Sequence, residues 1–154
     1  MIAAISPAQL KSRSICYSPR TDNNVVRGTY FYRCLYSQEA AMTTGVFIVI
    51  PFRNANVVAS GKGFVSFSIR ENADCIKTIC DIEKTLLDRL GLTSTQRVES
   101  LSSAARSGII RNVVLPNQTS LVGPTTMILR VSGIWEDDAG HGLVYRFIVP
   151  SHPL

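Results

Sequence analysis

Arginines and aromatic residues alternate along short stretches of this chain that are rich in strand-forming residues. In residues 28–36, Tyr30, Tyr32 and Tyr36 share one face of an expected strand, and Arg33 lies on the other. Aromatic rings stack on nucleic-acid bases, and the planar guanidinium of arginine pairs with phosphate. These residue types at this spacing are typical of a surface that binds single-stranded nucleic acid.

The same combination recurs on later strands and supplies a full set of candidate binding residues. The structural alternative is that strand aromatics form the core, which is their usual role. The candidates for phosphate contact are Arg33, Arg53, Lys62, Arg70, Arg130 and Arg146, and those for base stacking are Tyr30, Tyr32, Tyr36, Phe64 and Tyr145.

The chain contains one glycine-rich turn, residues 60–63, that partly resembles a phosphate-binding loop. The loop template requires a glycine, four intervening residues and then Gly-Lys followed by a hydroxyl residue. Asn56 and Gly63 occupy those two positions, so the sequence fails the template twice. We therefore interpret the segment as a flexible turn whose Lys62 can still contact a phosphate.

Residue types that support catalysis or metal binding are few and badly spaced. The two histidines, His141 and His152, lie in a turn and near the chain end, with no partner close in sequence. The adjacent acids 136–138 are expected to face solvent and accept local backbone hydrogen bonds. Cys75 and Cys80 are about 140° apart on the expected helix and cannot share a metal there. The sequence thus predicts no catalytic residue, no metal site, no cofactor and no enzymatic activity.

Hydrophobic periodicity predicts a chain made mostly of strands. Residues 73–90 have the helical spacing of apolar side chains, with Asn72 as the expected N-cap and Gly91 as the stop signal. Residues 92–108 are small and polar and predict a loop or one weak helical turn. The expected strands are residues 28–36, 45–51, 64–70, 109–115, 125–135 and 143–149, with a turn over residues 136–142.

This order predicts a mainly β fold, namely an OB-fold-like Greek-key barrel of five or six strands. One helix, at about residues 73–90, is expected between the third and fourth strands. A different small barrel and an α+β sandwich remain alternatives. We expect a single barrel domain over residues 28–150, preceded by an irregular, mobile arm over residues 1–27.

Composition and charge describe a globular chain with a basic first half. Of the 154 residues, 45% are hydrophobic, and no apolar run approaches the roughly 20 residues needed to cross a bilayer. The start of the chain lacks the charged leader and long apolar core of a signal peptide, so an intracellular protein, cytoplasmic or nuclear, is expected. Residues 1–71 hold eight cations against three acids, which accounts for the whole net charge of +5.

A resemblance concerns residues 128–147, ILRVSGIWEDDAGHGLVYRF. The stretch consists of an apolar strand, Gly-Ile-Trp-Glu, an acidic turn, and then Gly-Leu followed by an aromatic, a cation and Phe. It resembles the closing hairpin of OB-fold single-stranded-DNA-binding proteins. Those proteins are encoded by DNA viruses, bacteriophages and self-replicating transposons. The resemblance implies Trp135 at a strand end, with Tyr145 and Arg146 on the last strand. Many such proteins also end in an acidic tail, which this sequence does not show.

The sequence therefore favours a sequence-tolerant single-stranded DNA-binding protein that coats or protects strands in DNA replication or recombination. RNA is an alternative ligand, and a homo-oligomer or replication proteins are alternative partners. The resemblance also points to a viral or mobile-element protein acting in a host cell. The alternative function is a structural or protein-interaction module, such as a viral assembly or virion subunit, that binds no nucleic acid.

Overall fold

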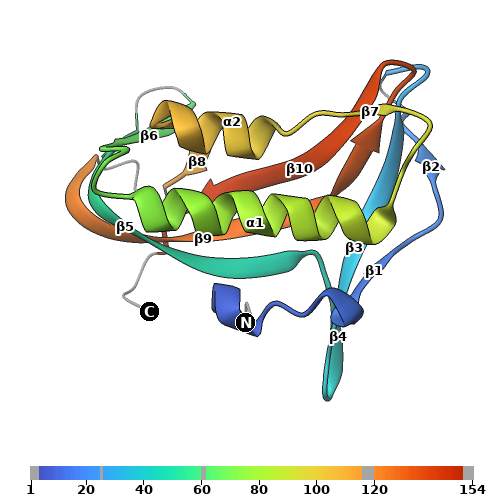
Figure 1. Ribbon diagram of the computed structural model, residues 1–154, viewed down its shortest axis with the longest axis horizontal. Helices are drawn as coiled ribbons and strands as arrows, with labels where there is room; N and C mark the ends of the chain where they lie inside the picture. Colours follow the sequence, from blue (N-terminus) through green and yellow to red (C-terminus); the bar gives the residue numbers. More distant parts are fainter. Residues whose placement is uncertain (1–3, 25, 60–61, 116–119, 151–154) are drawn as a thin grey trace.

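Strands make up most of the computed structural model, which describes residues 4–24, 26–59, 62–115 and 120–150 (Figure 1). The strands are β1 Ile15–Tyr17, β2 Thr21–Asp22, β3 Tyr30–Gln38, β4 Ala41–Thr44, β5 Val46–Val58, β6 Gly63–Phe67, β7 Gln96–Arg97, β8 Ile109–Val114, β9 Leu121–Glu136 and β10 Gly140–Ile148. The helices are α1 Ala73–Leu90 and α2 Ser100–Ser107, with the 3-10 turns η1 Pro7–Gln9 and η2 Ser12–Ser14. The prediction of a mainly β fold is confirmed.

Five of these strands close into a barrel in the order β9-β5-β6-β8-β10, with β10 pairing back onto β9. All neighbours in this ring are antiparallel except β8 and β10, which run parallel through Val113–Phe147 and Val114–Ile148 pairs. β3 pairs with the end of β9 outside the ring, and β1, β2 and β4 pair with β3. As expected, α1 follows three predicted strands, which correspond to β3, β5 and β6. Only two of them, β5 and β6, belong to the ring.

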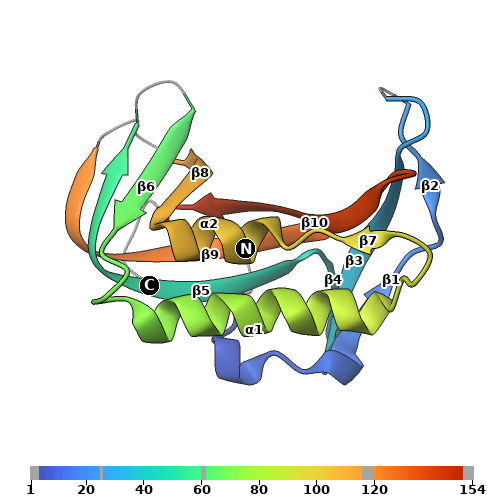
Figure 2. The same cartoon turned by 45° about the horizontal axis from the view of Figure 1, so that its top comes forward.

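The barrel interior is filled by alternate residues of its long strands. Ile48, Ile50 and Phe52 of β5 face Leu129 and Met127 of β9, and all five side chains are buried. Strand alternation places one side chain in two on this inner side. Both helices lie on the same side of the long strands β9 and β10 (Figures 1 and 2), and α1 buries its own apolar stripe there.

β5 is longer than expected, because Pro51 does not end it. The Phe47 carbonyl accepts from the Ile5 N–H, and the Val49 N–H donates to the Ile5 carbonyl. The backbone N–H and C=O groups of every second residue, Phe47 and Val49 among them, therefore point to the edge of β5 away from β9. Pro51 follows Val49 by two residues, so its backbone nitrogen points to this same edge. β6 pairs with this edge only from Ala55 onward. The missing N–H of Pro51 therefore removes no ladder hydrogen bond.

The position of α1 is confirmed, but Asn72 does not act through the expected side-chain cap. Its buried amide accepts from the Arg53 N–H at 2.8 Å and donates to the Arg53 carbonyl at 2.8 Å and the Ser68 carbonyl at 2.9 Å. These bonds hold the start of α1 against the irregular part of β5, where Asn54 has a φ of 47°. At its other end, α1 stops at Gly91 in the left-handed conformation, as predicted.

The expectation of a single helix is wrong, because α2 forms within the small, polar segment predicted as a loop or one weak helical turn. Glu83 of α1 is fully buried, and its two carboxylate oxygens accept the backbone N–H groups of Leu101 at 3.0 Å and Ser102 at 2.9 Å. Otherwise unpaired N–H groups at a helix start are thereby satisfied, at the end where negative charge is favourable. Leu101 and Ala105 then bury the apolar side of α2.

The described part of the segment expected to be an irregular arm is joined to the sheet. β1 pairs with β3, and Ile15 is fully buried. The Tyr17 hydroxyl donates to the Leu86 carbonyl of α1 at 2.8 Å, and Arg89 of α1 donates to the Ile15 carbonyl at 2.9 Å. These contacts attach residues 15–17 to both the sheet and α1.

Replacing Glu83 by alanine should lower the free energy of unfolding by about 2–4 kcal/mol, because two buried N–H groups lose a charged acceptor. The measurement is chemical denaturation followed by circular dichroism. Asp81→Ala, which removes an exposed acid from the same helix, should change the stability by less than about 0.5 kcal/mol. Equal losses in the two variants would contradict this role of Glu83.

Candidate nucleic-acid interface

The sheet formed by β3, β9 and β10 has one side facing the helices and one side that no described helix covers. Figures 1 and 2 show α1 and α2 together on the first side. Glu136 pairs with Tyr30 and His141 on the helix side, and Trp135 pairs with Phe31 and Gly142 on the other. We call the second side the open face and define it by the side chains of Phe31, Arg33, Phe47, Arg130, Trp135, Val144 and Arg146.

Two aromatic rings on the open face lie over glycines of the neighbouring strand. A Cβ added at Gly133 would come within 2.6 Å of the Phe31 ring, and one added at Gly142 within 3.1 Å of the Trp135 indole. Glycine at these positions lets each ring approach the backbone on one side. Both aromatic residues are half-buried, so part of each ring is accessible to a stacking partner.

Two arginines occupy directly opposite positions on the open face. Arg130 of β9 pairs with Arg146 of β10, and the Arg130 guanidinium lies 5.6 Å from the centre of the Phe47 ring on β5. The Arg130 Nε is buried without a hydrogen-bond partner, and neither arginine forms an ion pair within the described residues. Like charges directly opposite each other destabilise a sheet. An anion bound between them would remove that cost.

Acidic residues are missing from this side of the sheet within the described parts of β3, β5, β9 and β10. The outward positions near the arginine pair are apolar, small or basic, among them Ser132, Gly133 and Val144. Arg33 of β3 pairs with Gly133 of β9 and is exposed. The open face therefore has a positive potential with no internal counter-charge.

The three tyrosines predicted to stack on bases lie on the helix side of β3, away from the open face. Tyr36 is 4% exposed; its hydroxyl donates to the Gln9 carbonyl and accepts from the Lys11 N–H, so the ring cannot reach a base. One face of the Tyr30 ring is covered by the Arg20 guanidinium at 3.9 Å. Tyr32 donates to the buried Glu136 carboxylate at 2.9 Å. Tyr36 therefore offers no ring face, whereas Tyr30 and Tyr32 are half-buried and their role in base stacking stays a prediction.

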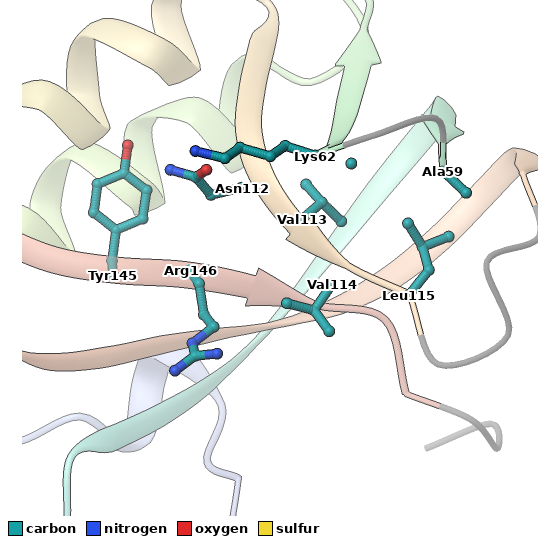
Figure 3. A pocket seen from close by; sticks show the side chains of 9 residues that line it. Ala59, Lys62, Asn112, Val113, Val114, Leu115, Tyr145 and Arg146 are labelled. Carbon is teal, nitrogen blue, oxygen red and sulfur yellow. The ribbon is translucent and has the colours of Figure 1, made fainter.

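Four of the predicted residues lie around or beside the opening between β8 and β10. Lys62, Tyr145 and Arg146 line a cavity of about 680 Å³ there (Figure 3). Phe64 faces outward on β6, is half-buried and pairs with Arg111 of β8. As the resemblance implies, Trp135 is the penultimate residue of β9, and Tyr145 and Arg146 are on the last strand.

The remaining two predicted cations are not part of this group. Arg53 lies at the irregular part of β5 and lines a different cavity, together with Asn72 and Cys75. Arg70 is exposed in the turn before α1. The structure thus places Arg33, Arg130 and Arg146 on the open face and Lys62 at the cavity that Arg146 also lines, and it leaves Arg53 and Arg70 beside the start of the helix.

A buried polar network on the helix side corrects the expectations for His141 and Glu136. The Thr95 hydroxyl lies 2.9 Å from both Glu136 Oε2 and His141 Nδ1. Glu136 and His141 are 5% and 1% exposed, so a substrate has no access to either. The prediction that adjacent acids face solvent is therefore wrong for Glu136. It holds for Asp137, which accepts the N–H groups of Ala139 and Gly140 as expected.

Neither metal binding nor membrane insertion has direct support in the described residues. No group of three or more histidine, cysteine or acidic side chains within them is arranged to hold a metal ion. Neither of their helices has the length and hydrophobicity of a membrane-spanning helix. In comparisons with known proteins, no protein family, no curated protein and no solved structure matches this chain.

Stability should fall as the pH decreases through about 6.5, because the fold disfavours a charged His141. Burial, and then the positive charge of Arg97, lower the pKa of His141 below its ordinary value, although Glu136 and Thr95 act in the opposite direction. Below pH 6.5 the unfolded chain takes up a proton that the native chain does not. The free energy of unfolding is thus expected to decrease from pH 7 toward pH 5, by at most about 1.4 kcal/mol per pH unit for this group.

Denaturation at several pH values tests this expectation with His141→Gln, which should flatten the dependence. The matched control is His152→Gln, which replaces a histidine outside the described residues. Asp88, whose pKa is lowered by hydrogen bonds from Lys84 and Arg97, titrates at lower pH and outside this window. An unchanged pH dependence in the His141 variant would rule out His141 as its source.

Proposed function

We propose that this protein binds single-stranded DNA with little sequence preference along the open face and protects exposed strands during replication or recombination. RNA is the alternative ligand. The observation that carries the proposal is the Arg130–Arg146 pair, two cations opposite each other that form no ion pair with an acid among the residues the structure describes. A phosphate between them would supply acceptors for both guanidinium groups.

The aromatic residues of the open face support binding of single strands over duplex. In a single strand the base faces are available, and each base stacked on an aromatic ring contributes about 1–3 kcal/mol. Phe31 and Trp135 are held against glycine backbone, so little side-chain entropy remains to be lost on binding. Stacking needs no base-edge hydrogen bonds, which agrees with weak sequence preference.

The strand order supports an OB-fold-like barrel for this chain. β9, the fourth strand of the ring, lies beside β5, the first, in the spatial order β9-β5-β6-β8. A fourth strand that returns beside the first is the Greek-key order, and the OB-fold is a five-stranded Greek-key barrel that binds oligonucleotides. We offer this fold relationship, and the viral or mobile-element origin that the resemblance implies, as part of the proposal.

Exposed apolar side chains favour a second candidate, a protein-interaction module. Met42 on the β3–β4 hairpin is 59% exposed, and Val122 on β9 is 85% exposed. Both belong to strands, which can add a neighbour from another molecule. Such a module would assemble through these strands and need no nucleic acid.

The proposal predicts that the double variant Arg130→Gln/Arg146→Gln binds oligo-dT at least about 10-fold more weakly than the wild type. Its plot of log affinity against log salt should also be flatter by about 1.4, because two fewer phosphate contacts release fewer counterions. The measurement is fluorescence anisotropy of labelled oligo-dT over a range of salt concentrations. Arg106→Gln, an exposed arginine on α2, is the matched control and should bind normally.

Wild-type protein that fails to bind oligo-dT at low salt would contradict the nucleic-acid proposal. If the protein also forms stable oligomers in high salt, the results favour the protein-interaction module. Duplex DNA that competes as well as the single strand would remove the stacking argument. In that case the arginine pair would remain as a general phosphate contact.

A further inference from the structure

The wall of the barrel opens between β8 and β10, because these strands pair only near their ends. Their paired residues are Val113 with Phe147 and Val114 with Ile148. Beyond these pairs the gap forms the cavity of about 680 Å³, which falls within the usual range of small-molecule sites. The nine lining residues that the structure describes include two cations and no acid.

A β-bulge gives this cavity its polar rim. The register between β6 and β8 shifts from the Gly63–Val113 pair to the Phe64–Arg111 pair, so Asn112 is the extra residue. Asn112 has a φ of 62°, a conformation that non-glycine residues adopt uncommonly. A Cβ at Gly63 would come within 2.3 Å of the Val113 carbonyl oxygen, so the close strand approach requires glycine.

The side chains around the opening come from three strands or their ends and have complementary chemistry. In Figure 3, Lys62 and Asn112 extend toward Tyr145, whereas Arg146 projects to the opposite side of β10. Tyr145 therefore offers a ring inside the cavity, and Arg146 connects the cavity to the open face. Burial, and next the nearby Glu83, raise the pKa of Tyr145, although a hydrogen bond with Ser100 acts in the opposite direction.

We propose that this cavity holds one nucleotide of the bound strand, with its base against the Tyr145 ring and its phosphate at Lys62, while Arg146 contacts the neighbouring phosphate on the other side of β10. The inference rests on the proposed function, because it places the cavity on the path of a strand that crosses the open face. The Asn112 amide can donate to and accept from a base edge. The nucleotide would thus anchor a strand that is otherwise held by stacking and charge.

Photo-crosslinking tests the location directly. Oligo-dT carrying one iodouracil base at successive positions is irradiated with the protein, and the crosslinked peptide is identified by mass spectrometry. The proposal expects one strand position to crosslink to Tyr145 while its neighbours crosslink to Trp135 or Phe31. Circular single strands and linear strands with or without a 5′-phosphate distinguish an internal nucleotide from a terminal one.

Variants test the energetic role in parallel. Tyr145→Leu and Lys62→Gln should each weaken oligo-dT binding by about 5-fold or more, whereas Tyr145→Phe keeps the ring and should bind normally. Lys62 is exposed, so its variant tests the cavity even if Tyr145→Leu fails to fold. Arg106→Gln again serves as the charge-matched control.

Failure of this inference can be told apart from failure of the proposed function. If wild-type protein binds oligo-dT but the Tyr145→Leu and Lys62→Gln variants bind equally well, and crosslinks form only on the open face, the cavity assignment is wrong while the proposed function stands. If wild-type protein does not bind oligo-dT at low salt, the proposed function is wrong and the cavity assignment falls with it.

Discussion

The pairing of β9 with three other strands is the constraint on which the rest of the structure depends. Residues Leu121–Val131 of β9 pair with β5, residues Gly133–Glu136 pair with β3 along the same edge, and the other edge pairs with β10. One half of this strand closes the barrel, and the other half carries the β3 extension. The strand is therefore both a wall of the core and the middle of the open face.

An irregularity within β9 reconciles these two roles. Gly133 pairs with Val144 and Val131 with Tyr145, so β9 has one extra residue, Ser132, at this point. A bulge of this kind changes which side chains face each side of a sheet. Val131 and Ile134 are consequently both buried on the helix side, although they are three residues apart. The open face keeps Gly133, beside the aromatic part, and Arg130, which belongs to the arginine pair.

Buried polar groups attach the surrounding elements to this framework. Glu83 satisfies backbone N–H groups of α2, Asn72 joins the start of α1 to β5, and Thr95 lies between Glu136 and His141. A polar group taken out of water is costly unless it is hydrogen bonded. These bonds therefore specify where the helices and the loop before β7 lie. The helix side becomes filled, and no described helix covers the opposite side of the sheet.

The chain's sequence determined its local elements. Alternating apolar residues predicted the main strands, and apolar spacing with Gly91 predicted the helix at residues 73–90 with its correct end. These patterns are visible in the sequence because each depends on residues close together along the chain. The supply of arginines and strand aromatics, from which any interface here must be built, was equally clear.

Only the tertiary structure decided which of these residues share a surface. β3 carries aromatics on both faces, so alternation alone did not show that Tyr30, Tyr32 and Tyr36 face the helices and Phe31 faces outward. The decisive partners are distant in sequence, since Phe31 lies over Gly133 and Trp135 over Gly142 across strands. α2 likewise depends on Glu83, a residue of another helix. Burial and long-range pairing set these outcomes, because a side chain's role depends on what the folded chain places against it.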